Sequence, residues 1–178
     1  MKQRVFKLCV FALCAALLFS PVKSSAFSTT TAMDLSFEFG AYRSPYSAAY
    51  AFGINYSGRL GNGLEAAGMG DDYVLSPSLF MLDVKQIVAS QSAFYTLYIK
   101  TDTSLWGAGT NFACQLGDGT TETRTRPVKI LDNVMQAAAG DGGSAALTFD
   151  GDLYVWGTDV RSFFKNQNMN CSVPQKIA

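Results

Sequence analysis

Two pairs of segments in the chain match each other in register, and this repeat constrains the fold more than any other feature of the sequence. Residues 53–63 match residues 109–119 at an offset of 56, and residues 99–109 match residues 147–157 at an offset of 48. A period of several tens of residues is typical of repeat architectures, in which each copy is one supersecondary unit. The chain is therefore predicted to consist of successive copies of one unit.

Prolines give a second measure of this period. Pro77, Pro127 and Pro174 each precede an aliphatic run, at steps of 50 and 47 residues. These steps agree with the first two offsets, so we expect three copies of the unit. We also expect each of these prolines to stand just before a strand.

Each copy is predicted to be built from β-strands. Residues 145–149 and 152–156 are β-prone runs joined at Asp150-Gly151, and Asp-Gly between such runs indicates a hairpin because glycine accepts the positive φ of tight turns. Residues 35–39 alternate apolar and polar side chains, which predicts one strand over these residues. Nothing after residue 26 shows a convincing helical period, so the sequence predicts an all-β fold.

Glycines dominate the positions that define the repeat. We interpret the runs at 61–63 and 117–119 as tight turns, because they lack the lysine and the following helix of a phosphate loop. The repeat-defining residues are Gly53, Asn55, Leu60, Gly61, Gly109, Asn111, Gln115, Leu116, Gly117, Gly140, Gly151, Trp156 and Gly157.

Residues 111–120, together with Pro127, the step at 138–140 and Trp156-Gly157, resemble the repeat of regulator-of-chromosome-condensation proteins. In that family, asparagine and glycine-glutamine-leucine-glycine lead through a proline strand and an alanine-alanine-glycine step to a hairpin that ends in tryptophan-glycine. The resemblance implies that each repeat is one four-stranded blade of a seven-bladed β-propeller. About three blades fit here, so it implies a partial propeller, either a truncated product or a piece completed by other chains.

The chain departs from the family pattern at several positions. Tyr95 and Gly143 stand where the family has a histidine, Ala108 where it has a tryptophan, and Cys114 where it has a glycine. After Gly157 the pattern decays, so the last repeat is predicted to be degenerate.

The first 26 residues have the order of a secretory signal. Three cations precede the apolar run 8–18, and Ser24 and Ala26 are small residues suited to a cut after Ala26. The apolar run is shorter than the ~20 residues that a spanning helix needs. We therefore expect a signal peptide over residues 1–26, a repeat region over residues 27–178, export to the medium or cell surface, and no membrane attachment after cleavage.

Export would leave Cys114 and Cys171 in an oxidising compartment. One interpretation is a disulfide between them, and the other is two separate thiols buried as small apolar side chains. The spacing of two cysteines along a chain cannot establish the approach that a disulfide requires.

The residue types argue against catalysis. The chain has no histidine, which excludes Ser-His-Asp and Cys-His mechanisms. The close carboxylate pairs are Asp71-Asp72, in a glycine-rich loop, and Asp150 with Asp152, around the hairpin turn. Neither offers the spaced oxygen ligands of a calcium loop. We predict no catalytic residues, no cofactor and no metal site.

These observations favour a secreted, non-catalytic protein-interaction module, which could also self-associate through open strand edges. Four of the 14 Lys and Arg residues lie in the signal, so 10 remain against 14 acidic residues, a net charge of −4 that disfavours nucleic acid. Two alternatives stay open. One is a remnant of a guanine-nucleotide exchange factor, the activity of the family's namesake, and the other is a carboxylate-based glycan hydrolase.

Overall fold

The computed structural model describes residues 33–35, 39–43, 47–64, 73–90, 94–158 and 172–177. The predicted signal segment and its cut after Ala26 lie outside these residues. Within the described ranges the only helical element is one 3-10 turn, η1 (Tyr56–Gly58), and no helix there is long and apolar enough to span a membrane.

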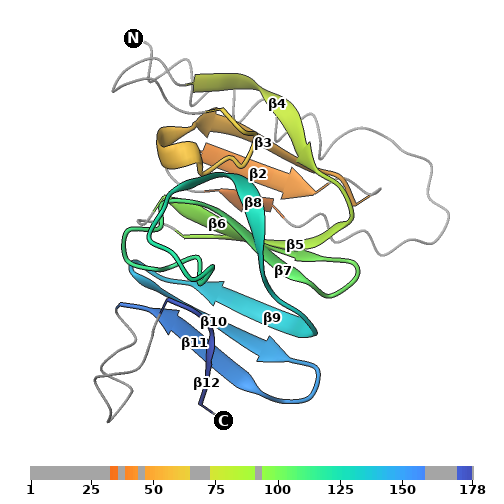
Figure 1. Ribbon diagram of the computed structural model, residues 1–178. Helices are drawn as coiled ribbons and strands as arrows, with labels where there is room; N and C mark the ends of the chain where they lie inside the picture. The colour runs from red at the N-terminus through yellow and green to blue at the C-terminus, as the bar shows by residue number, and fades with distance from the viewer. Residues whose placement is uncertain are drawn as a thin grey trace, which may run out of the picture. The chain divides into compact units, whose positions relative to one another are not determined.

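The described strands form three four-stranded sheets that follow one another along the chain (Figure 1). Each sheet pairs its strands antiparallel and in chain order, so each is a meander, and we call the sheets the first, second and third blade. The first blade holds β1 (Met33–Leu35), β2 (Phe39–Arg43), β3 (Ala49–Ile54) and β4 (Tyr73–Met81). The second holds β5 (Val84–Ala89), β6 (Tyr95–Lys100), β7 (Leu105–Gly109) and β8 (Arg124–Leu131). The third holds β9 (Val134–Ala139), β10 (Gly143–Thr148), β11 (Leu153–Gly157) and β12 (Gln175–Lys176).

Three successive four-stranded blades confirm the prediction of an all-β, partial propeller. The hairpin predicted at Asp150-Gly151 is also present, since β10 pairs with β11 and the Thr148 N–H donates to the Asp152 carbonyl at 2.9 Å. Gly151 adopts a φ of +88°, as the turn requires.

One strand prediction is wrong. Residues 35–39 do not form a single strand, because Leu35 ends β1 and Phe39 begins β2, and the two strands pair antiparallel with Leu35 opposite Gly40. Alternation over five residues cannot distinguish one strand from the ends of two that meet at a hairpin.

The proline prediction needs a correction. Pro77 and Pro127 lie inside β4 and β8 rather than before them, and only Pro174 directly precedes its strand, β12. Both interior prolines fall where the register with the neighbouring strand shifts, and β4 and β8 are the last strands of their sheets. A strand without a neighbour on one side tolerates the missing N–H of proline.

The hydrophobic core lies in two seams between neighbouring blades. Strand β5 contacts β1 and β2, and β9 contacts β5 and β6, so the first strands of the blades are neighbours. The first seam, between the first and second blades, buries Ala49, Ala51, Leu60, Val84, Ile87, Tyr98 and Ala108. The second seam, between the second and third blades, buries Tyr95, Leu97, Ile99, Leu105, Leu116, Val134, Ala137, Ala146 and Trp156.

The two ends of the blades differ in their connections. Residues 55–64 and 110–123 form long loops at one end, which we call the loop end, and residues 101–104 and 149–152 form tight turns at the other. In Figure 1 the long loops lie on the left and the tight turns on the right.

Candidate interaction surface at the loop end

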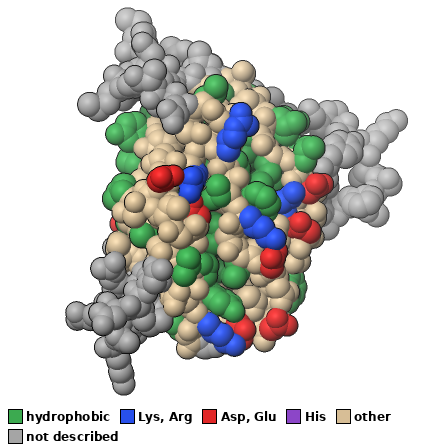
Figure 2. Space-filling model, in the orientation of Figure 1, with side chains coloured by type: hydrophobic (Ala, Val, Ile, Leu, Met, Phe, Trp, Pro, Cys, Tyr) green, Lys and Arg blue, Asp and Glu red, His purple; other side chains and the backbone are tan. Residues whose placement is uncertain are grey.

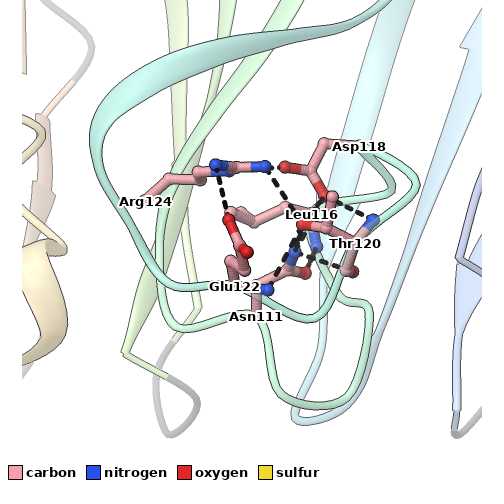
Figure 3. Close-up of polar contacts among 6 residues, drawn as sticks. All are labelled: Asn111, Leu116, Asp118, Thr120, Glu122 and Arg124. Atoms are coloured by element: carbon pink, nitrogen blue, oxygen red, sulfur yellow. Dashed lines mark hydrogen bonds and ion pairs between the residues drawn. The ribbon is translucent and has the colours of Figure 1, made fainter.

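A buried asparagine organises the long loop of the second blade (Figure 3). The fully buried Asn111 accepts a hydrogen bond from the Leu116 N–H at 2.9 Å through Oδ1. Its Nδ2 donates to Asp118 Oδ1 at 2.9 Å and to the Thr120 carbonyl at 3.0 Å. One amide side chain therefore holds three groups of the loop in place, two on the backbone and one on a side chain. These hydrogen bonds also satisfy the buried amide, which would otherwise be unpaired.

The first blade repeats this arrangement. Asn55 Oδ1 accepts from the Leu60 N–H at 3.1 Å, and Asn55 Nδ2 donates to Asn62 Oδ1 at 3.1 Å and to the Leu64 carbonyl at 2.9 Å. The sequence match at an offset of 56 is thus a match of hydrogen bonds, and both loops are held in one conformation by their asparagine.

The second loop adds a charged cluster that has no counterpart among the described residues of the first loop. Arg124 Nε lies 2.6 Å from Asp118 Oδ2, and Arg124 Nη1 lies 3.2 Å from the exposed Glu122 carboxylate. Burial raises the pKa of Asp118, but hydrogen bonds from Arg124 and Thr120 outweigh it, so the pKa lies below its ordinary value. In the first blade, Asn62 stands in the place of Asp118, and Val74, opposite Gly53, in that of Arg124, opposite Gly109.

The Asp118 cluster predicts an acid-dependent loss of stability. Because the folded carboxyl has the lower pKa, the unfolded chain binds a proton first as the pH falls, and the unfolding free energy decreases with it. We expect Asp118→Asn to be less stable than the wild type at about pH 7 and the gap to close towards about pH 3, below the ordinary Asp pKa of ~3.9. Urea unfolding at several pH values measures this, and a pH-independent gap would contradict it.

An aromatic side chain projects from the same position of each loop. Tyr56 is 44 % exposed and Phe112, its equivalent at the offset of 56, is 73 % exposed. The Tyr56 ring packs edge-on against Phe94 with centroids 5.4 Å apart, and the buried Arg59 places its guanidinium 4.7 Å from the Phe94 centroid. The loop end therefore presents large apolar side chains on a fixed backbone.

The second seam holds the loops in place. The Gln115 carbonyl accepts from Ser144 Oγ at 2.7 Å and from Trp156 Nε1 at 2.9 Å. The hydroxyl of Tyr95 accepts from the Gly140 N–H at 3.0 Å and lies 3.0 Å from the Gly143 carbonyl, to which it donates. Tyr95 thus fastens the second blade to the third with its buried side chain.

Every residue predicted to define the repeat lies among the described residues. Six of the seven glycines have a positive φ, the exception being Gly140, whose main chain instead takes part in the second seam. The asparagines, Leu60, Leu116, Gln115 and Trp156 are all buried. The structure therefore brings the asparagine and leucine positions together within each loop, and Gln115 joins the second loop to Trp156 of the next blade.

Of the two predicted carboxylate pairs, the structure describes one. Asp150 Oδ2 accepts from Asn133 Nδ2 at 2.5 Å, and Asp152 Oδ1 pairs with Lys176 Nζ at 2.7 Å, so each carboxylate stabilises a turn or a strand end. Asp71-Asp72 lies outside the described residues. Among the residues described, no group of three or more His, Cys, Asp or Glu side chains could hold a metal ion.

The bridge between Cys114 and Cys171 stays a prediction, because Cys171 lies outside the described residues. The mass of the unreduced protein tests it. Sequence reasoning also missed the roles of Phe112 and Tyr95: the repeat alignment locates both residues, but exposure and contacts across a seam depend on neighbours distant in the chain.

Comparison with known proteins agrees with this geometry. Residues 102–147 match the model of the Regulator of chromosome condensation (RCC1) repeat. The X-linked retinitis pigmentosa GTPase regulator of Mus musculus is 36% identical over 116 residues, 61% of this chain and 11% of that protein. The ultraviolet-B receptor UVR8 of Arabidopsis thaliana is 33% identical over 123 residues, 66% of this chain and 27% of the receptor.

Solved structures show the same fold. Human WBSCR16 superposes with a TM-score of 0.65 at 22% identity, covering 86% of this chain and 39% of that one. Yeast RCC1 (Prp20), solved bound to Kap60, gives 0.67 at 18% identity, with 82% and 36% covered. The chain thus spans less than two fifths of the length of either structure. The repeat model, the sequence relatives and the blade geometry agree, and the chain belongs to the RCC1-repeat family.

Proposed function

We propose that this chain is a secreted, non-catalytic protein-interaction module whose partner contacts the loop end. The observation that carries the proposal is the pair Tyr56 and Phe112, two exposed aromatic side chains at the same position of successive repeats. Their loops are fixed by the buried Asn55 and Asn111, so the loops would lose little conformational entropy when a partner binds. Aromatic side chains on rigid loops are typical anchors of protein interfaces.

The relatives support a protein as the partner. One is named a GTPase regulator, one yeast RCC1 structure contains Kap60, and another was reported with its binding properties to Gsp1p and histones. Because this chain spans only 11% and 27% of the two curated relatives described above, their own partners do not transfer to it. The chemistry we assign is a protein surface with an apolar centre.

The charge distribution fits a protein partner better than a polyanion. Figure 2 shows Lys and Arg side chains interspersed with Asp and Glu, and with apolar side chains between them. Nucleic-acid binding draws most of its affinity from basic side chains that meet phosphates. A chain with more acidic than basic residues after export, and with charges of both signs on this face, supplies little of that attraction.

The double variant Tyr56→Ala with Phe112→Ala tests the loop end. The exported protein, expected to begin at Phe27, is used to capture its partner from the extracellular medium, and the affinity for the identified partner is then measured. We expect the double variant to bind at least about thirtyfold more weakly, because loss of an aromatic anchor costs about 2 kcal/mol or more.

Leu79→Ala is the matched control, because Leu79 is a 51 % exposed apolar side chain on β4, away from the long loops. It should keep the wild-type affinity. Melting temperatures of all three proteins show that the folds are equivalent. Equal binding by the double variant and the wild type would refute the loop end as the interface. The N-terminus of the exported protein is a separate test, because an exported protein that still begins at Met1 would refute the predicted signal cleavage.

Guanine-nucleotide exchange is the second candidate, favoured by the name of the GTPase regulator that is 36% identical to this chain. It makes a different prediction for the same preparation. A chain that accelerates release of bound nucleotide from a small GTPase would be an exchange factor, whereas the interaction module leaves the release rate unchanged.

We also propose that the outer face of the third blade packs against a further blade, supplied by a second copy or by additional repeats. Leu97, Ile99 and Leu105 of the second blade are fully buried by the third. Their equivalents at the offset of 48, Ala145, Leu147 and Leu153, are only partly buried. If a second copy covers this face, Leu147→Glu should convert a dimer to a monomer in sedimentation velocity, and a monomeric wild type would exclude the second copy.

A further inference from the structure

The sequence contains one Asn-Gly pair, Asn62-Gly63, and it lies in the loop of the first blade where that loop meets the second blade. Asparagine followed by glycine is chemically labile, because glycine has no Cβ to hinder attack by its own backbone nitrogen on the asparagine side chain. The other three asparagines of the described residues precede Tyr56, Phe112 and Val134. Position 62 is therefore the candidate for spontaneous modification.

The reaction needs no enzyme and no reactant other than water. The Gly63 nitrogen loses its proton to water and bonds to Asn62 Cγ, while the Cγ–Nδ2 bond breaks and ammonia leaves. Water then opens the cyclic imide at one of its two carbonyls. One product is aspartate, and the other is isoaspartate, in which the main chain runs through the side chain and is one carbon longer.

In the folded protein the attacking nitrogen, that of Gly63, already takes part in a hydrogen bond. The Gly63 N–H donates to the Thr125 carbonyl of β8 at 2.8 Å, a hydrogen bond across the first seam. The Asn62 side chain is also held, because its Oδ1 accepts from Asn55 Nδ2 and from the Leu64 N–H, each at 3.1 Å. Attack on Cγ requires both groups to leave these partners, so the first seam must open locally.

The second blade shows what the product would meet. Asp118-Gly119 occupies the equivalent place, with Asp118 Oδ1 accepting from Asn111 and from the Thr120 N–H, and with Gly119 donating to the Ser172 carbonyl at 2.9 Å. An aspartate at 62 would keep the same hydrogen bonds. An isoaspartate would displace Gly63 from Thr125 because of its extra main-chain carbon.

We propose that Asn62 is a deamidation site gated by the first seam, so that each opening of the seam exposes the chain to a modification whose isoaspartate form prevents the seam from closing. The site is protected while the blades are docked. The hydrogen bond between Gly63 and Thr125 acts as the gate, and the reaction leaves a covalent record of seam opening.

The rate of deamidation in the full chain tests the gate. The protein is incubated at mildly alkaline pH, folded or in urea, and the gain of one mass unit in the peptide that contains Asn62 is followed by mass spectrometry. We expect the folded protein to react at least about tenfold more slowly than the unfolded chain, a ratio that corresponds to about 1.4 kcal/mol of opening. Equal rates, or no reaction in urea, would overturn the proposal.

Gly58→Ala locates the gate. A Cβ at Gly58 would lie 2.7 Å from the Thr125 Cα, so the variant must displace the strand that accepts the Gly63 N–H. Gly151→Ala is the matched control, since it also places alanine at a positive φ, but its Cβ meets no atom within 4 Å and lies in a tight turn at the end of the blades opposite the loop end. We expect Gly58→Ala to deamidate faster than the wild type and Gly151→Ala to match it. The reverse order would place the gate elsewhere.

Hydrogen exchange keeps the test decisive if Gly58→Ala fails to fold. The Gly63 amide of the wild type exchanges through the same opening that permits attack, so its protection factor should agree with the ratio of unfolded to folded deamidation rates. A Gly63 amide that exchanges freely in a protein whose Asn62 stays protected would show that the hydrogen bond to Thr125 is not the gate.

Discussion

Trp156→Ala is expected to lower the unfolding free energy by about 3–5 kcal/mol, the usual cost of removing a buried aromatic side chain. Trp156 is fully buried in the second seam, and its Nε1 donates to the Gln115 carbonyl at 2.9 Å. Its ring covers Gly117, where a Cβ would lie 2.6 Å from the Trp156 Cδ1. Truncation therefore empties the space between the third blade and the loop of the second. Thermal unfolding should show a decrease in Tm of about 10–20 °C.

Trp156→Phe separates packing from hydrogen bonding. It keeps most of the ring and removes the indole N–H, so we expect a loss of about 1 kcal/mol, the net contribution of one hydrogen bond. The Gln115 carbonyl would still accept from Ser144 Oγ. If Trp156→Ala melted within a few degrees of the wild type, the second seam would not depend on this side chain.

The features that the sequence predicted well are those set by local chemistry. The hairpin at Asp150-Gly151 depends on a glycine that can adopt a φ of +88°, and that requirement is visible in two adjacent residues. The repeat itself is visible because Asn55 and Asn111 each make hydrogen bonds within nine residues of chain. Because these hydrogen bonds lie within one loop, each copy of the loop needs the same residue types at the same positions.

The features that were missed depend on partners distant in the chain. Tyr95 binds the Gly140 N–H and the Gly143 carbonyl, 45 and 48 residues away, and neither the period nor the residue type indicates that contact. Pro77 and Pro127 read as strand starts because proline disrupts a ladder. They are interior because β4 and β8 end their sheets and tolerate a missing donor.

The candidate surface shows the same division. Alignment of the two loops places Tyr56 and Phe112 at one position, but aromatic residues at strand ends are equally suited to packing within a blade. Tyr56 is 44 % and Phe112 is 73 % exposed, although each loop contacts the next blade through other residues. Which aromatic residues face solvent is therefore a property of blade packing, and it could be found only from the structure.

Gly157→Ala should be far more damaging than Gly151→Ala, although both glycines have a positive φ, +96° and +88°. A Cβ at Gly157 would collide with the Gly142 carbonyl oxygen and lie 2.7 Å from the Gly143 Cα, whereas a Cβ at Gly151 meets no atom within 4 Å. Gly151→Ala is left with the backbone strain alone, about 1 kcal/mol. Gly157→Ala adds overpacking against main-chain atoms, for a total of about 3 kcal/mol.

Backbone atoms decide this difference because, unlike the end of a side chain, they cannot rotate away. Gly143 lies opposite Gly157 in the β10–β11 ladder, so relief of the collision would separate the two strands that carry Ser144 and Trp156 to the second seam. Urea unfolding of the two variants with equal m-values measures the gap directly. Equal losses would mean that conformational strain governs both positions, and that the close approach of β10 to β11 at Gly157 relaxes without cost to the seam.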